Sequence, residues 1–194
     1  MTASTTRSCK RHGARRRALL FLIGLAGLPG AAHAEGIVVR VAELEAADEG
    51  YHLNADFDID FNPVVEDALT HGIPLNFLLE LEVWRPRAWW FNESLVTLQE
   101  TRKLSYNPLT RQYRLSLGSV YQNFTNLRET LQVLSHIRSA PLVDVAALHK
   151  GQRYEASLRF SLDVAQLPKP FQIDALASRD WQLSSALYRW SFSP

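Results

Sequence analysis

Acidic side chains at alternate positions are the first group in this chain that could do chemistry. Asp56, Asp58 and Asp60 form the pattern D-x-D-x-D, which opens a calcium-binding EF-hand loop. That loop needs a glycine directly after the third acid for its sharp turn, and Phe61 stands there instead. The acids also alternate with apolar residues, as they do in a half-buried strand. We therefore expect a solvent-exposed acidic strand face, and no metal site.

Two further carboxylates stand beside a tryptophan. Glu80 and Glu82 share one face of a period-two segment with Trp84, and paired carboxylates next to an aromatic ring are typical of glycoside hydrolases. Residues two apart on a strand are also typical of an ordinary solvent-facing surface. A hydrolase that uses Glu80 or Glu82 with a histidine is therefore only a remote alternative.

Other catalytic motifs do not occur in the sequence. The chain has no G-x-S-x-G segment and no glycine-rich loop after a strand. The histidines at positions 52, 71, 136 and 149 have neither HxH nor HxxxH spacing. A triad assembled in space stays open. We expect a protein that is not an enzyme and that needs no cofactor.

Aromatic and arginine side chains gather in one short segment. The segment contains Trp84, Arg85, Arg87, Trp89, Trp90 and Phe91. Aromatic rings with arginine are enriched at binding hot spots, and they also suit sugar rings or a lipid headgroup boundary. The alternative is that alternate tryptophans are buried and the arginines only solvate a turn. We predict that this cluster binds a partner.

A second group of basic and aromatic residues could extend that surface. Arg111, Tyr113 and Arg114 follow a turn that begins at Asn107. We include Arg111 among the predicted partner-binding residues. The same three residues could equally be ordinary cross-strand neighbours of residues near Glu100.

Most of these residues lie on predicted strands. Residues 51–61 alternate apolar and polar without a break, which is strong evidence for a half-buried strand. A turn at 48–50 joins this strand to a β-rich segment at 37–44, so that the two form a hairpin. Further strands are predicted at 74–84, 95–104, 112–117 and 153–164. The segments 171–176 and 181–192 are predicted to add final strands.

Two helices are predicted between these strands. The short one has Asn62 as its cap, Pro63 at its first position and Gly72 at its end. The main one repeats apolar residues at helical spacing from Leu127 to Ile137, and a helical turn is expected at 142–148. The fold class is α+β and β-dominated, with an antiparallel sheet or sandwich on which one main and one short helix pack.

The first 34 residues have the order of a secretory signal peptide. Six basic residues precede an apolar run at 18–30, and a small-x-small cleavage site ends at Ala34. The apolar run falls short of the roughly 20 residues of a membrane span, although retention as an uncleaved anchor stays the alternative. We expect residues 35–194 to form a single globular domain, exported to the periplasm without a lipid anchor.

Removal of this segment changes the charge of the chain. The six basic residues leave without any acid, so that 15 basic and 20 acidic side chains remain, with a formal charge of −5. That balance argues against nucleic-acid binding, which depends on lysine and arginine. The only cysteine, Cys9, leaves as well. The core must therefore hold the domain without a disulfide.

Several segments of the chain resemble a known family. They are residues 36–41, the Trp89-Trp90-Phe91 cluster, residues 104–113, and the ending from Asp180 to Trp190. In these segments the chain is similar to the DUF4390 family of exported proteobacterial proteins. The resemblance covers nearly all of the part that follows the signal segment. The resemblance implies a location in the cell envelope and carries no catalytic or binding residues. It also makes a membrane sensor kinase one candidate partner.

Together these observations favour a recognition domain of the cell envelope. We expect a protein-interaction or signalling accessory module that uses the Trp84 to Phe91 segment. A small-ligand or lipid-binding protein is the alternative, with a pocket between the sheet and the helix at 127–137. The ligand, the strand order and the oligomeric state stay open.

Overall fold

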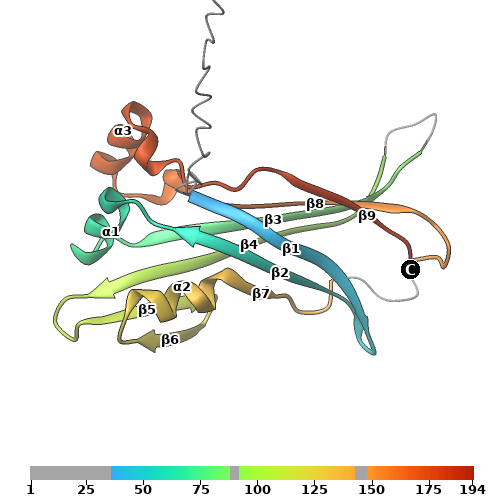
Figure 1. Ribbon diagram of the computed structural model, residues 1–194, viewed down its shortest axis with the longest axis horizontal. Helices are drawn as coiled ribbons and strands as arrows, with labels where there is room; N and C mark the ends of the chain where they lie inside the picture. Colours follow the sequence, from blue (N-terminus) through green and yellow to red (C-terminus); the bar gives the residue numbers. More distant parts are fainter. Residues whose placement is uncertain (1–35, 88–91, 143–147) are drawn as a thin grey trace, which may run out of the picture. The chain divides into compact units, whose positions relative to one another are not determined.

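Two antiparallel sheets make up most of the part of the chain that the structure describes. The structure, a computed structural model, covers residues 36–87, 92–142 and 148–194. These residues form nine strands and three α-helices (Figure 1). The prediction of a β-dominated fold with antiparallel pairing is confirmed. Within this part of the chain, no helix has the length and apolar character that a membrane crossing requires.

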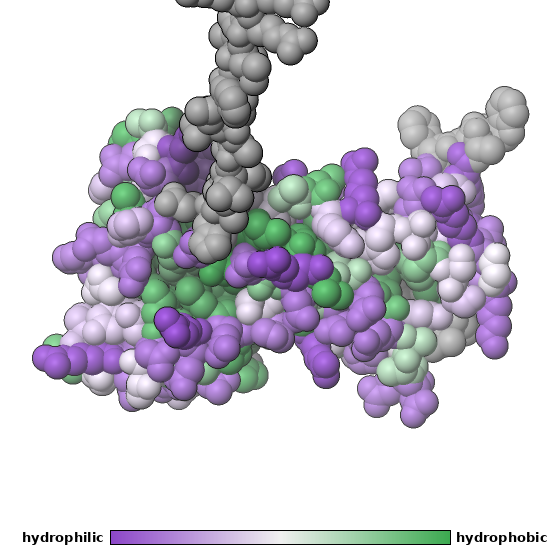
Figure 2. Space-filling view, in the orientation of Figure 1, coloured by the Kyte–Doolittle hydropathy of each residue, from purple (hydrophilic) through white to green (hydrophobic). Residues whose placement is uncertain are grey.

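The smaller sheet is built on the predicted hairpin. It has the order β1 (Gly36–Ala47), β2 (Gly50–Asp60) and β7 (His136–Arg138). Leu53, Ala55 and Phe57 of β2 are buried, whereas Asp58 and Asp60 are exposed. The alternation predicted for this strand is therefore confirmed. Apolar side chains gather over the start of β1 and the end of β2 (Figure 2).

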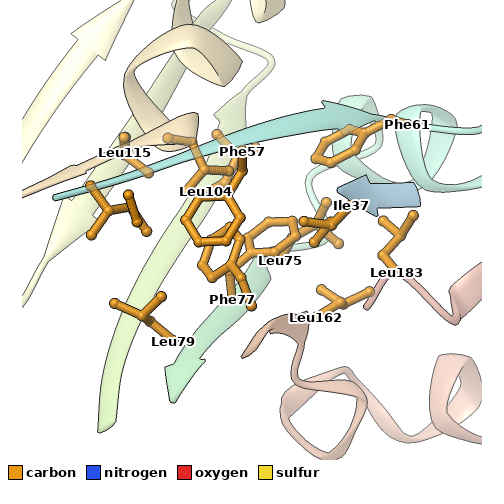
Figure 3. Packing of buried hydrophobic residues seen from close by; sticks show 14 of the residues in the cluster. Ile37, Phe57, Phe61, Leu75, Phe77, Leu79, Leu104, Leu115, Leu162 and Leu183 are labelled. Carbon is orange, nitrogen blue, oxygen red and sulfur yellow. The ribbon is translucent and has the colours of Figure 1, made fainter. Parts of the chain in front are cut away.

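The larger sheet is centred on β3 and its two neighbours. Its order is β6 (Val120–Phe124), β5 (Gln112–Leu117), β4 (Glu93–Asn107), β3 (Leu75–Arg85), β8 (Tyr154–Leu162) and β9 (Tyr188–Phe192). Phe77, Leu79 and Leu81 of β3 are fully buried. Both sheets contribute to one apolar cluster. Figure 3 shows Phe57 and Phe77 pointing into the same space as Leu75 and Leu104.

Three helices of similar length connect the strands. They are α1 (Pro63–Thr70), α2 (Leu127–Ser135) and α3 (Lys169–Ala177), and two short 3-10 helices, η2 (Val164–Gln166) and η3 (Arg179–Trp181), flank α3. Asn62 caps α1 as predicted, because its side-chain oxygen accepts the N–H of Val65 at 3.0 Å. Gly72 follows the helix with a φ of 88°, which glycine adopts without strain.

The prediction of one main and one short helix is wrong. Residues 171–176 were predicted as a strand and lie in α3, whose first turn accommodates Pro170. Gln172 fixes this helix, because its side-chain amide donates to the carbonyl oxygens of Ala165 and Leu167, each at 2.7 Å. These bonds join the helix to the residues just before it, five and seven positions back in the chain, and the apolar pattern of the segment did not indicate them.

The predicted helix at 127–137 is shorter than expected. Asn126 caps α2 by accepting the N–H of Glu129 at 2.8 Å, which confirms its start. The helix ends at Ser135, and Ile137 lies in β7 opposite Ala55 of β2. Ile137 stays buried, because its strand closes the small sheet. The strand β6 was not predicted, and the helical turn expected at 142–148 lies mostly outside the described residues.

Asn62 offers a test of how α1 is attached. Besides capping the helix, its side-chain NH₂ donates to the carbonyl oxygen of Asp180 at 2.6 Å, although Asn62 is only 8 % exposed. The change N62A should cost about 2 kcal/mol in the free energy of unfolding, because it removes a cap and also the partner of a carbonyl in a partly buried hydrogen bond. The change N126A, which removes only a cap, should cost about 1 kcal/mol. Urea unfolding measures both, and equal losses would contradict the role of the bond to Asp180.

Candidate functional site

The described part of the predicted aromatic and arginine cluster lies at one end of β3. Trp84 and Arg85 are the last residues of β3, and Arg87 follows the strand. Trp89, Trp90 and Phe91 lie outside the described residues. Arg85 and Arg87 both form ion pairs with Glu93 at the start of β4, the second with an N–O distance of 2.6 Å. One carboxylate therefore holds both arginines at the end of the sheet.

These ion pairs change the acidity of Glu93. Hydrogen bonds from Arg85, and then from Arg87, lower the pKa of this carboxyl below its ordinary value of 4.5. The ionised form is therefore favoured, and both arginines stay bound to it at neutral pH.

Trp84 stands between two hollows on the outer face of the large sheet. The larger hollow measures about 350 Å³ and the smaller about 260 Å³, and both are lined by Trp84 and Arg189. We call this surface the Trp84 face. It comprises Glu80, Glu82, Trp84, Arg153, Arg159 and Arg189.

The pairing of the strands places acidic and basic side chains near one another on the Trp84 face. Glu80 on β3 lies opposite Arg159 on β8. Trp84 lies opposite Glu155, and Arg189 on β9 lies opposite Ser157. Opposite charges on neighbouring strands stabilise a sheet modestly. They also leave a mixed surface of donors and acceptors around one aromatic ring.

Two indole groups at the larger hollow lack hydrogen-bond partners. The Nε1–H groups of Trp84 and Trp190 are buried, and neither has an acceptor in the described part of the chain. A buried donor without an acceptor costs about 1–3 kcal/mol. A partner that brought a carbonyl or carboxylate oxygen to either group would remove that cost.

The arrangement around Glu80 and Glu82 lacks the histidine that a hydrolase was expected to use. Both glutamates line the smaller hollow, where their charged neighbours are Arg159 and Arg189, and its lining within residues 36–87, 92–142 and 148–194 includes no histidine. Nor do the described residues bring together three histidine, aspartate or glutamate side chains in a group that could hold a metal ion. The geometry therefore offers recognition groups and gives no support to the hydrolase alternative.

Two of the three aspartates of β2, Asp56 and Asp58, lie within ion-pair distance of basic side chains. Arg40 of β1 forms an ion pair with Asp58. His136 Nε2 lies 3.6 Å from Asp56 Oδ1. The predicted strand placement of these acids is confirmed, and cross-strand neighbours offset their mutual repulsion.

Arg111 does not extend the Trp84 face. It lies in the turn between β4 and β5, whereas Trp84 and Arg85 lie at the other end of β4. The 15 residues of β4 separate these two turns, a length of roughly 50 Å (Figure 1). Arg114, which was grouped with Arg111, stacks over the ring of Tyr121 at 4.6 Å. The cross-strand alternative is therefore the one that the structure supports for Arg114.

The largest of these hollows was not predicted from the sequence. A cleft of about 660 Å³ lies between α1 on one side and α3 with η3 on the other. We call it the α1–α3 cleft. Its walls include Val64 and Asp67 of α1, Phe171 and Asp174 of α3, and Trp181 of η3. The two helices are about 100 residues apart in the chain, and α3 had been predicted as a strand, so that no local pattern indicated a cleft.

The histidines and the expected ligand pocket lie apart from the Trp84 face. His71 lines the α1–α3 cleft, and His52 contacts the carbonyl oxygen of Ser139 at 3.1 Å. The alternative of a ligand pocket against the helix at 127–137 finds no support in the three hollows described above, since none is lined by α2.

The arginine pair allows a direct test at Glu93. The change R85Q should raise the pKa of Glu93 towards 4.5, because it removes the hydrogen bond that lowers that pKa most. The stabilisation from this carboxylate is present above pH about 4.5 and is lost as the pH falls through the lowered pKa. A carboxyl NMR titration measures the shift, with R114Q as the control. An unchanged pKa in R85Q would show that Arg85 does not bind Glu93 in solution.

Comparison with known proteins gives a family. No curated protein and no solved structure matches the chain. One family does match, over residues 34–191, and its description is domain of unknown function (DUF4390). The match includes β1 to β8, the Trp84 face and the α1–α3 cleft. It also agrees with the resemblance seen in the sequence. The chain therefore belongs to the DUF4390 family.

Proposed function

We propose that this chain is an exported recognition domain of the bacterial cell envelope, a protein-interaction or signalling accessory module that binds a protein partner through the Trp84 face. One observation carries the proposal: a tryptophan stands between two hollows that share an arginine. Large aromatic rings beside arginine supply much of the binding energy in protein interfaces. The scaffold is a sandwich of the two sheets, and its core is the apolar cluster that they share.

The chemistry of the face favours a protein over a small molecule. The hollows are shallow and adjoin each other, and charges of both signs surround them. Such a mixture suits the peptide groups and paired charges of another protein surface. A single small ligand is usually held in a deeper and more apolar pocket. A small-ligand or lipid-binding function is therefore the weaker candidate.

Export to the periplasm is the second part of the proposal. It is supported by the basic, apolar and small-x-small order of residues 1–34. A partner in the envelope follows from that location. A membrane sensor kinase is one candidate, on the strength of the family resemblance alone.

The partner proposal predicts a loss of capture when charge is reversed on the Trp84 face. The protein is cross-linked inside the periplasm, and the captured partner is identified by mass spectrometry. In R153E/R189E, capture should fall at least tenfold, because both exposed arginines of the larger hollow become repulsive at an interface. The matched control is R128E/R138E, which makes the same charge change at exposed positions on α2 and β7. Unchanged capture in R153E/R189E would remove the Trp84 face from the function.

The export proposal predicts the first residue of the mature protein. Protein recovered from the envelope should begin at Glu35, because cleavage follows the small residues Ala32 and Ala34. Intact mass and N-terminal sequencing measure this. The change A34D should block cleavage and leave the full-length chain. A wild-type protein that keeps residues 1–34 would instead show that the segment serves as an anchor.

A further inference from the structure

The α1–α3 cleft has one wall fixed by a buried asparagine. Asn62 accepts the N–H of Val65 at 3.0 Å and donates to the carbonyl oxygen of Asp180 at 2.6 Å. It therefore ties the start of α1 to η3 across the chain. Trp181, only 3 % exposed, packs edge-on against Phe171 with ring centroids 5.6 Å apart. The base of the cleft is thus held by hydrogen bonds and a buried ring.

The opposite wall is fixed as well. The side-chain amide of Gln172 donates to the carbonyl oxygens of Ala165 and Leu167, and Ala175 is buried against the core. Ser178 caps η3 by accepting the N–H of Asp180 at 3.1 Å. Because both walls are already ordered, a partner would bind without the entropic cost of shaping the site.

The cleft combines apolar walls with an acidic rim. Its exposed surface is mostly apolar, and Val64 is 43 % exposed. Asp67, Asp174 and Asp180 also line it, whereas none of the described residues that line it is a lysine or an arginine. In the described part of the chain, none of these aspartates forms an ion pair with lysine or arginine. Asp67 has only His71 within reach, at 3.4 Å. The field in the cleft is therefore negative.

Apolar surface continues beyond the cleft. Ile173 and Leu176 of α3 are 68 % and 89 % exposed, and they neighbour Asp174 and Ala177 of the cleft wall in the chain. Apolar side chains are visible at the surface over α3 (Figure 2). A small cation would occupy only a small part of the cleft and leave this surface in water. A longer segment with apolar side chains would cover both.

We infer that the α1–α3 cleft is a second docking site, which binds a basic amphipathic segment of a partner protein. The apolar side chains of this partner segment lie against Val64, Phe171 and Ala177. Its lysine or arginine side chains pair with Asp67, Asp174 and Asp180 of the cleft. An amphipathic helix that lays its apolar face in a groove is a common mode of recognition. The opposite charges hold it in one orientation. This inference does not rest on the Trp84 face, which lies at the far end of β3.

The first test uses defined peptides. The probes are a 14-residue amphipathic peptide of leucine and lysine and its counterpart of leucine and glutamate. They are titrated into ¹⁵N-labelled residues 35–194. The lysine peptide should shift the amide signals of residues 64–71 and 171–181, and the glutamate peptide should not. Equal binding of both peptides, or shifts confined to other regions, would overturn the inference.

Charge variants distinguish binding in the α1–α3 cleft from a general attraction of the lysine peptide to an acidic protein. D67N/D174N should weaken binding of the lysine peptide at least tenfold. The matched control D48N/E49Q removes two charges from the exposed turn between β1 and β2 and should change binding less than twofold. Equal weakening in both would show general attraction to an acidic protein. The Trp84-face variant R153E/R189E should leave peptide binding intact, so that a failure of this inference and a failure of the Trp84 proposal give different results.

The second test identifies the natural occupant. A photo-cross-linking amino acid is placed at Val64, with Thr125, an exposed residue before α2, as the control position. The cross-linked segment is then sequenced by mass spectrometry. The inference expects a basic, apolar segment of another protein, captured from Val64 only and at least tenfold less in D67N/D174N. A second copy of this chain, a lipid or an acidic segment as the captured species would each overturn it.

Discussion

Four phenylalanine rings pack together between the two sheets. Their burial decides which side chains of each strand point into the core and which point outward. Phe57 of β2 lies 4.9 Å from Phe160 of β8, which lies 5.6 Å from Phe77 of β3, and Phe61 stacks on Phe77 at 5.9 Å. All four rings are buried, and aromatic pairs of this kind contribute about 0.5–1.5 kcal/mol beyond the burial of their area. Because strand side chains alternate, an inward Phe57 forces Asp56 and Asp58 outward, and an inward Phe77 forces Glu80, Glu82 and Trp84 outward. The Trp84 face therefore follows from the packing of the core.

The parts of the fold that were predicted correctly are those in which one local pattern decides the structure. The alternation of β2 has a single inward face, and Asn62 and Asn126 cap helices through bonds to residues three positions away. The errors arose where contacts outside the element itself decide its structure. Gln172 holds α3 by bonds to residues that precede the helix, and Ile137 leaves the helical pattern to pair with Ala55, far away in the chain. Propensity and periodicity contain no information about such partners.

The candidate sites follow the same division. The aromatic and arginine character of residues 84–87 is visible in the sequence. The structure adds Arg153, which precedes β8, Arg159 of β8 and Arg189 of β9, all much later in the chain. Arg111 was assigned to this surface because of its type and its nearness to a turn, yet the long strand β4 carries it to the opposite end of the sheet. The α1–α3 cleft shows the limit most clearly. Its two walls are far apart in sequence, and the partly buried hydrogen bond from Asn62 to Asp180 that joins them has no local signal.

The two surfaces share one mechanical support, the central strand β3. Leu75 begins this strand soon after α1 ends, and Trp84 is its penultimate residue, so that about 30 Å of hydrogen-bonded strand separates them. A strand paired on both sides is stiff, and the separation of the surfaces is therefore fixed. A partner that reaches both would bind the second as an intramolecular event, with a gain in avidity that depends on whether its own span matches this length. A partner too short to span it would occupy one surface and leave the other free for a second protein. The length of β3 thus decides between bivalent binding of one partner and the bridging of two.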